Sequence, residues 1–183
     1  MGILFADVRG YTALAEKEAP EEIARLLNRF YAVATNQLAS RDALIDKLVG
    51  DEVMALFLTG LTGPGCFRKM ASAAEGLLRG VGYGSAEEPW LPLGIGLDFG
   101  IAYVGNVGSG EVKDFTALGD VVNTAARLQA EAKAGQIVMS ERVYREVAER
   151  YPDVPLIELQ LKGKSEPVAA RVVEFGAQVP AIR

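Results

Sequence analysis

The order of the apolar segments along this chain constrains its fold more than any other feature of the sequence. Strands and helices are distinguished by apolar spacing, by turn residues, and by Pro20 at a helix start. The dipeptide Gly50-Asp51 between two apolar runs is typical of a two-residue hairpin turn. The expected strand, helix, strand, strand, helix and strand cover residues 2–8, 20–38, 43–49, 52–58, 67–79 and 93–107. This order predicts an α+β fold with a ferredoxin-like split βαβ (βαββαβ) core.

The rest of the chain predicts an additional C-terminal α/β lobe. Loops are expected over 58–65 and 80–92, where glycine and proline accumulate. The later strands and helices are expected over 115–118, 120–132, 136–139, 140–150, 155–162 and 168–175. We expect one catalytic domain over 1–176 and a tail over 177–183, with an upstream sensor domain belonging to a longer protein.

Composition excludes several function classes. The sequence has no histidine and a single cysteine, so Ser-His-Asp and Cys-His catalysis are excluded, and an internal disulfide cannot form. A net charge of −5 argues against non-specific nucleic-acid binding. No apolar stretch approaches the roughly 18 residues of a membrane span, so we expect a cytoplasmic protein.

Asp7 ends the first apolar run and precedes a turn that contains Gly10. One interpretation is a metal ligand, since a buried strand seldom ends in an unpaired acid. The other is a cap for the following helix, and Asp7 alone does not decide between them. The turn over residues 8–12 can direct backbone N–H groups toward phosphate.

Asp51 by itself is explained by turn chemistry, which favours aspartate. The hairpin tip of such a core, however, lies beside the end of the first strand. Asp7 and Asp51 together could therefore hold two divalent cations, an arrangement suited to in-line attack at phosphorus. Without histidine, the ligands are carboxylates and carbonyls, which favours Mg²⁺ or Mn²⁺.

Two further sets of polar residues do not by themselves distinguish a functional role from a surface position. Asn123 and Arg127 lie four residues apart and share one face of a predicted helix. Lys162 and Lys164 flank Gly163 at an expected strand end. Solvated surface positions are the commoner explanation for both sets.

Four segments together resemble the class III nucleotide cyclases, over about residues 3–175. The segments are Phe5–Thr12, Lys47–Asp51, Asp114–Leu128 and Leu161–Lys164, and they occur in the family's order. The resemblance implies that Asp7, Asp51 and the Val8 carbonyl hold two Mg²⁺ or Mn²⁺ ions per active site. It also implies phosphate contacts from Gly10, Tyr11, Thr12 and Lys162.

The resemblance further implies an active site shared between two chains. Asn123 would orient the ribose, and Arg127 would stabilise charge on the transition state. In the family these two residues come from the partner subunit of a head-to-tail homodimer. The ribose 3′-hydroxyl then attacks the α-phosphorus, and pyrophosphate leaves.

Base choice is expected to rest on Lys47 and Thr116. The pair resembles subclass IIIb, several members of which respond to bicarbonate. A lysine donates to adenine N1 and a threonine oxygen can accept from the N6 amine, whereas guanine presents the reverse pattern. Some relatives carry an arginine for phosphate where this chain has Gly94.

The sequence therefore predicts an adenylyl cyclase that converts ATP to 3′,5′-cyclic AMP and pyrophosphate. A guanylyl cyclase is a rival that Lys47 and Thr116 disfavour. A diguanylate cyclase is another, because Gly50-Asp51-Glu52 echoes its signature, although that family has no counterpart of Asn123 and Arg127. An inactive cyclase-homology dimerisation module is the rival from a different class.

Overall fold

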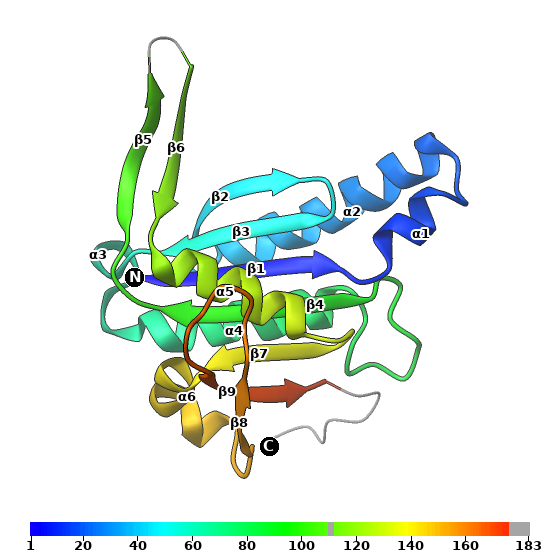
Figure 1. The fold of residues 1–183 in the computed structure, drawn as a ribbon. Coiled ribbons are helices and arrows are strands. Elements are labelled where there is room, and N and C mark those ends of the chain that lie inside the picture. The colour runs from blue at the N-terminus through cyan, green and yellow to red at the C-terminus, as the bar shows by residue number, and fades with distance from the viewer. Residues whose placement is uncertain (110–111, 176–183) are drawn as a thin grey trace.

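A seven-stranded mixed sheet forms the centre of the molecule in the computed structural model, which describes residues 1–109 and 112–175 (Figure 1). The strand order is β2-β3-β1-β4-β7-β9-β8. The strands are β1 (Gly2–Val8), β2 (Leu44–Val49), β3 (Glu52–Phe57), β4 (Leu93–Phe99), β7 (Gln136–Ser140), β8 (Leu156–Leu159) and β9 (Val168–Glu174). A separate two-stranded hairpin, β5 (Tyr103–Ser109) and β6 (Val112–Leu118), projects from one end of the sheet.

Helices cover both faces of the sheet. In Figure 1, α5 crosses the near face, whereas α2 and α4 lie behind. The α-helices are α1 (Tyr11–Ala15), α2 (Pro20–Ala39), α3 (Thr59–Thr62), α4 (Cys66–Gly80), α5 (Asp120–Glu131) and α6 (Glu141–Val147). Within the described ranges, no helix combines the length and the apolar character that crossing a membrane requires.

The first six predicted elements form the expected ferredoxin-like core, which confirms the fold class. Strand β1 pairs antiparallel with both β3 and β4, and β2 pairs antiparallel with β3. The predicted C-terminal α/β part continues the same sheet, because β7 pairs parallel with β4 and antiparallel with β9. The lobe therefore shares its sheet with the core.

Alternation along β1 decides which side chains face which helices. Leu4, Ala6 and Val8 belong to the core cluster that contains residues of α2 and α4. Ile3 and Phe5 belong to the cluster with α5. Because successive strand residues point to opposite faces, Asp7 shares the α5 face with Ile3 and Phe5.

A glycine allows α5 to approach the sheet closely. A Cβ at Gly96 would collide with the Ala125 carbonyl and with the backbone of Gln129. Any larger residue on β4 at this point would push α5 outward. The position of Asn123 and Arg127 on that helix therefore depends on Gly96.

Several predicted boundaries differ from the structure. The expected loop 58–65 contains α3 and a 3-10 turn, Gly63–Gly65, and the short helix α1 was not predicted. The expected strand or hairpin 93–107 is divided between two sheets, β4 in one and β5 in the other. The helix expected over 140–150 ends at Val147 and continues as a 3-10 turn, while the proposed tail 177–183 lies outside the described residues.

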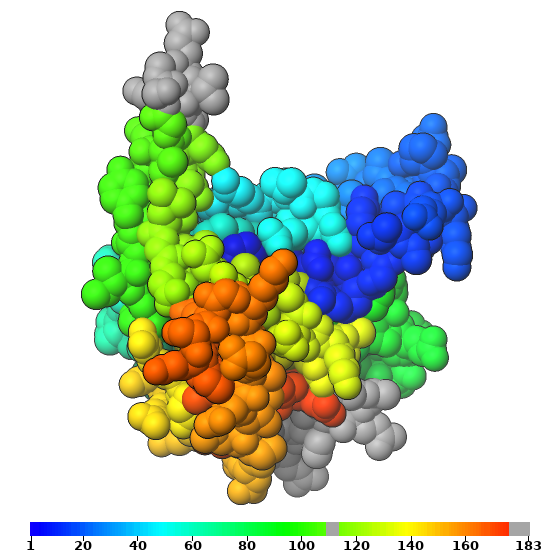
Figure 2. Space-filling model, viewed as in Figure 1, coloured from blue at the N-terminus to red at the C-terminus, as the bar shows by residue number. Residues whose placement is uncertain are grey.

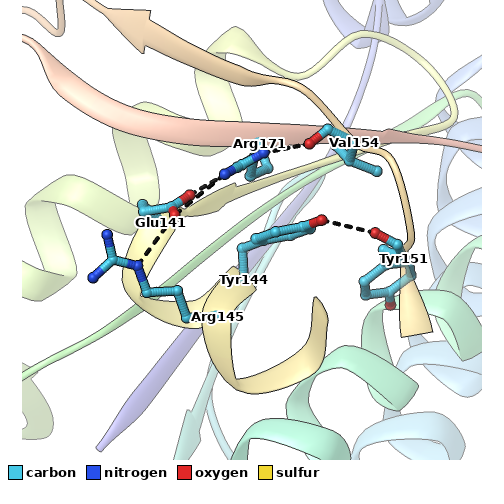
Figure 3. A network of polar contacts seen from close by, with 6 residues as sticks. All are labelled: Glu141, Tyr144, Arg145, Tyr151, Val154 and Arg171. Atoms are coloured by element: carbon cyan, nitrogen blue, oxygen red, sulfur yellow. Dashed lines mark hydrogen bonds and ion pairs between the residues drawn. The ribbon is translucent and has the colours of Figure 1, made fainter. Parts of the chain in front are cut away.

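A polar network ties α6 to β9 and to the segment before β8 (Figure 3). Arg171 donates to Glu141 at 2.7 Å and to the Val154 carbonyl, and its guanidinium lies over the Tyr144 ring. The Tyr144 hydroxyl donates to the Tyr151 carbonyl at 2.9 Å. These contacts hold the C-terminal strands against the helix.

A second buried network joins α4 to the end of this region. Glu75 accepts from Arg150 Nη2 at 2.6 Å and from the Tyr151 hydroxyl at 2.7 Å. Burial alone would raise the pKa of Glu75, but hydrogen bonds from Arg150 and Tyr151 outweigh it and hold the pKa below its usual value. The ionised carboxylate therefore stabilises the folded state.

We expect Glu75→Gln to lower the free energy of unfolding at pH 7 by about 2 kcal/mol, because Arg150 loses its buried anionic partner. A depressed carboxyl pKa contributes stability that is lost as pH falls through the folded value. The deficit of the variant should therefore shrink toward pH 4. Urea unfolding at pH 7 and at pH 4 measures the stability deficit of the variant at each pH. An equal deficit at the two pH values would contradict the stabilising role of the ionised Glu75 carboxylate.

Candidate active site

Asp7 and the hairpin tip meet at one end of the sheet. Asp7 lies opposite Glu52 in the β1–β3 register, and the Val8 N–H donates to the Asp51 carbonyl at 3.3 Å. The Tyr31 hydroxyl of α2 donates to the Gly50 carbonyl at 2.5 Å, which fixes the tip of the hairpin. The predicted proximity of Asp7 and Asp51 is therefore present within one chain.

Burial and a neighbouring acid both disfavour the negative charge of Asp7. Burial raises the pKa of Asp7 to about 6; the neighbouring Asp51 carboxyl adds to this, and Arg9 opposes it. Burial and Asp51 also raise the pKa of Glu52. An added cation at this end would relieve the repulsion.

The available donors fit a hard divalent cation. No cluster of three or more histidine, cysteine, aspartate or glutamate side chains suited to a metal occurs in residues 1–109 and 112–175. Protein ligands here are thus limited to two carboxylates and backbone carbonyls. Mg²⁺ commonly binds through one or two carboxylates with water and substrate phosphate completing its shell, so the donors suit it.

Arg9 occupies the space beside Gly94. Its Nη2 donates to Asp7 Oδ2 at 2.7 Å, and a Cβ at Gly94 would lie 2.9 Å from both Arg9 Nε and the Ala132 carbonyl oxygen. Packing against β4 therefore requires glycine at 94. The Arg9 guanidinium therefore lies next to Gly94, where some relatives were expected to carry an arginine.

The turn after Asp7 leads directly into α1. Gly10 adopts φ 75°, a left-handed conformation that favours glycine, and it precedes Tyr11 at the helix start. The N–H groups of Tyr11 and Thr12 have no acceptor within the helix, because they belong to its first turn. All three residues follow Asp7 closely in the chain, within the turn and the first turn of α1.

Lys47 and Thr116 are brought near each other where β2 meets the β5–β6 hairpin, through one acidic residue on each strand. Lys47 pairs with Asp114, and the Thr116 hydroxyl donates to Asp46 Oδ2 at 2.9 Å. Asp114 and Thr116 both lie on β6, two residues apart, so they share a face. Asp46 and Asp114 connect the two predicted residues, and the sequence interpretation gave neither a role.

Burial and hydrogen bonding shift the pKa values of Asp46 and Lys47. Burial raises the pKa of Asp46, while the Thr116 hydroxyl and Lys47 oppose the rise. The hydrogen bond to Asp114 raises the pKa of Lys47, which keeps the ammonium charged. Lys47 thus presents donors only.

Asn123 and Arg127 lie on α5, on the same side of the sheet as Asp7. Val121, Ala125 and Leu128 form the buried side of that helix, and Asn123 is exposed. The Arg127 guanidinium lies against Gly163, where a Cβ would be 3.1 Å from Nη2. Arg127 makes no hydrogen bond or ion pair with the part of the chain that the structure describes.

Lys162 lies in the turn between β8 and β9, because β8 ends at Leu159 and not near Lys162 as expected. Its side chain is exposed. Lys164 instead pairs with Asp120 at the start of α5, at 2.6 Å. Of the two lysines, Lys162 is the one directed to solvent.

Figure 2 shows this face hollowed between the β5–β6 hairpin and the α1–α2 segment, with β2 and β3 at its floor. Large apolar side chains are exposed near the base of the hairpin: Ile101, Tyr103, Phe115 and Leu118. Exposed apolar groups that gather in this way are typical of surfaces that contact another protein.

Comparison with known families identifies the family of this chain. The family model described as adenylate and guanylate cyclase catalytic domain matches residues 1–172. The chain belongs to this family. Its mixed sheet and helices match those of solved cyclase catalytic domains.

Individual cyclases are similar over most of the chain. An adenylate cyclase of Anabaena cylindrica is 34% identical over 97% of this chain, which spans 37% of that protein. The solved guanylyl cyclase Cya2 is 26% identical with a TM-score of 0.82, covering 98% of this chain and 93% of that one. The adenylyl cyclase CyaB from P. aeruginosa is 27% identical with a TM-score of 0.79, covering 94% and 93%. Structural similarity thus extends to both nucleotide specificities.

We expect Asp7→Asn to stabilise the metal-free protein at pH 7.5. One pKa unit corresponds to 1.36 kcal/mol, and after allowance for partial solvent access the gain should be about 1 to 2 kcal/mol. A raised carboxyl pKa costs stability above the folded value near 6, so the gain should vanish below about pH 4. Urea unfolding with a chelator present measures it.

Added Mn²⁺ supplies the matched control. It should raise the melting temperature of the wild-type protein, because binding to the folded state stabilises it, and should leave Asp7→Asn nearly unchanged. An equal rise in the melting temperature of both proteins would mean that Mn²⁺ binds at a site that does not include Asp7.

Proposed function

We propose that this cyclase domain converts ATP to 3′,5′-cyclic AMP and pyrophosphate in a homodimer with two shared sites. The observation that carries the proposal is that Asp46 and Asp114 connect Lys47 with Thr116, on the side of the sheet that also bears Asp7. Lys47 donates to adenine N1, and Thr116 accepts from the N6 amine. Guanine would leave both protein groups unpaired.

Asp7, Asp51 and the Val8 carbonyl hold two Mg²⁺ or Mn²⁺ ions in this proposal. When bound, the metals lower the pKa of the ribose 3′-hydroxyl and neutralise phosphate charge. Arg9 donates to Asp7 Oδ2, so its guanidinium would compete with a metal for this carboxylate. Gly10, Tyr11 and Thr12 orient the β- and γ-phosphates through their backbone.

Asn123, Arg127 and Lys162 complete the site from a second chain. Arg127 has no partner among the described residues, and Asn123 and Lys162 are exposed, so all three are available to a substrate. Asn123 orients the ribose, Arg127 stabilises charge at the α-phosphorus, and Lys162 binds phosphate. Exposed Ile101, Tyr103, Phe115 and Leu118 supply apolar contacts between the chains.

The base-binding residues belong to the same chain as Asn123. Strand β6 ends at Leu118 and α5 begins at Asp120, so one residue separates the strand that carries Thr116 from the helix. Lys47 is tied to β6 through Asp114. Each site therefore combines the acids of one chain with the base, ribose and α-phosphate contacts of the other.

A guanylyl cyclase is the second candidate, since similar structures include the guanylyl cyclase Cya2. The polarity of Lys47 and Thr116 argues against it. The chain spans 37% of the length of the Anabaena relative. Stimulation by bicarbonate remains a proposal from the subclass resemblance.

With Mn²⁺, we expect turnover of ATP to exceed turnover of GTP by at least about 100-fold in kcat/KM, because guanine leaves buried polar groups unpaired. Activity per chain should rise with protein concentration and then level off as dimers form. Chromatographic detection of cyclic AMP and cyclic GMP measures both the nucleotide preference and the dependence on protein concentration. Equal turnover of the two nucleotides would reject adenine selection.

Mixing inactive variants tests the shared geometry. Asp51→Ala and Arg127→Ala should each lower kcat by about 100-fold or more. An equimolar mixture should recover roughly a quarter of wild-type activity, because half the dimers are mixed and each has one intact site. No recovery, with mixed dimers shown to form, would contradict sites shared between chains.

A further inference from the structure

The β2 strand contains a bulge at Asp46. Ile45 lies opposite Ala55 and Lys47 opposite Met54, so Asp46 is an extra residue in the pairing with β3. In a regular strand, Asp46 and Lys47 would point to opposite faces. Bulges redirect side chains, and here both residues reach β6: Lys47 contacts Asp114, and Asp46 contacts Thr116.

The contact with Asp46 fixes the direction of the Thr116 hydroxyl. A threonine hydroxyl has one hydrogen and two lone pairs, and an ionised carboxylate only accepts. At the 2.9 Å separation between Thr116 Oγ1 and Asp46 Oδ2, threonine is therefore the donor. Its remaining hydrogen-bonding capacity is as an acceptor.

We propose that Asp46 is a positioning residue that sets the nucleotide preference of the site. By taking the hydroxyl hydrogen, Asp46 leaves Thr116 able to accept from an exocyclic amine and unable to donate to a carbonyl. Adenine presents the amine, and guanine presents the carbonyl oxygen. The inference rests on the proposed function, because it explains how the same site distinguishes its substrates.

Lys47 supplies the opposite polarity next to Thr116. Its ammonium donates, so the two side chains present one donor and one acceptor to the base. Without Asp46, the threonine hydroxyl could rotate and donate to guanine O6. Lys47 alone would then have to discriminate between the bases.

The second oxygen of Asp46 argues against a purely structural role. Asp46 Oδ1 is shielded from solvent and has no hydrogen-bond partner in the described ranges. A buried unpaired acceptor lowers stability. Asp46 therefore lowers the stability of the folded protein. A residue that lowers stability is expected to be kept for another reason, such as substrate specificity.

The test compares kcat/KM for ATP and GTP in the wild type, Asp46→Ala, Thr116→Val and the double variant. Asp46→Ala should lower the ATP-to-GTP ratio about tenfold, the size of one hydrogen bond's discrimination. The double variant should show no loss beyond Thr116→Val. Asp46→Asn should keep most of the preference, because its amide oxygen can still accept.

Two results would overturn the inference. One is an equal loss of ATP and GTP turnover in Asp46→Ala. The other is a further tenfold fall in the ratio when Asp46→Ala is added to Thr116→Val, since Asp46 would then act independently of the hydroxyl. Urea unfolding of each variant identifies effects that come from lost stability.

A binding assay separates this inference from the cyclase proposal. Calorimetry with Mn²⁺ and 3′-deoxy-ATP or 3′-deoxy-GTP measures base preference without turnover. A wild-type protein that prefers the adenine analogue but forms no cyclic product refutes the activity and leaves the inference intact if Asp46→Ala loses the preference. A wild-type protein with no base preference in either assay overturns the inference.

Discussion

The antiparallel pairing of β1 with both β3 and β4 is the constraint on which the rest of the structure depends. It sets Asp7 opposite Glu52 and brings the Asp51 carbonyl to the Val8 N–H. Because side chains alternate along β1, the same pairing directs Asp7 to the face that α5 covers. Without that register, the two carboxylates and the helix with Arg127 would not share a side of the molecule.

Stability and function oppose each other at this end of the sheet. Burial, with the nearby Asp51 carboxyl adding to it, raises the pKa of Asp7, so the folded chain holds this carboxylate at a cost in stability. Arg9 offsets part of this cost by binding Asp7, in space that Gly94 leaves open. The proposed binding of cations at this site would explain why the cost is retained.

The sequence predicted the core elements because their signals are local. Apolar spacing defined β1 and α2, and Gly50-Asp51 defined the hairpin, where Gly50 takes a positive φ of 58°. The division of residues 93–107 between two sheets could not be predicted, since it depends on the long-range pairing of β5 with β6.

The candidate site shows the same limit. Motif order located Asp7, Lys47, Thr116 and Arg127, but the positions of Asp46 and Arg9 depend on tertiary structure. Asp46 reaches Thr116 only through a bulge, and no periodic pattern in the residues beside Lys47 signals one. The Arg9 side chain occupies space that Gly94 leaves open, more than 80 residues further along the chain. A single sequence does not reveal that these two residues are neighbours.

The central claim is that each active site is assembled from two chains, and a crystal structure with Mn²⁺ and 3′-deoxy-ATP tests it most directly. The account predicts one nucleotide whose metals contact Asp7 and Asp51 of one chain. Its ribose and base should contact Asn123, Lys47 and Thr116 of the second chain. A nucleotide held entirely by residues of a single chain would contradict the account.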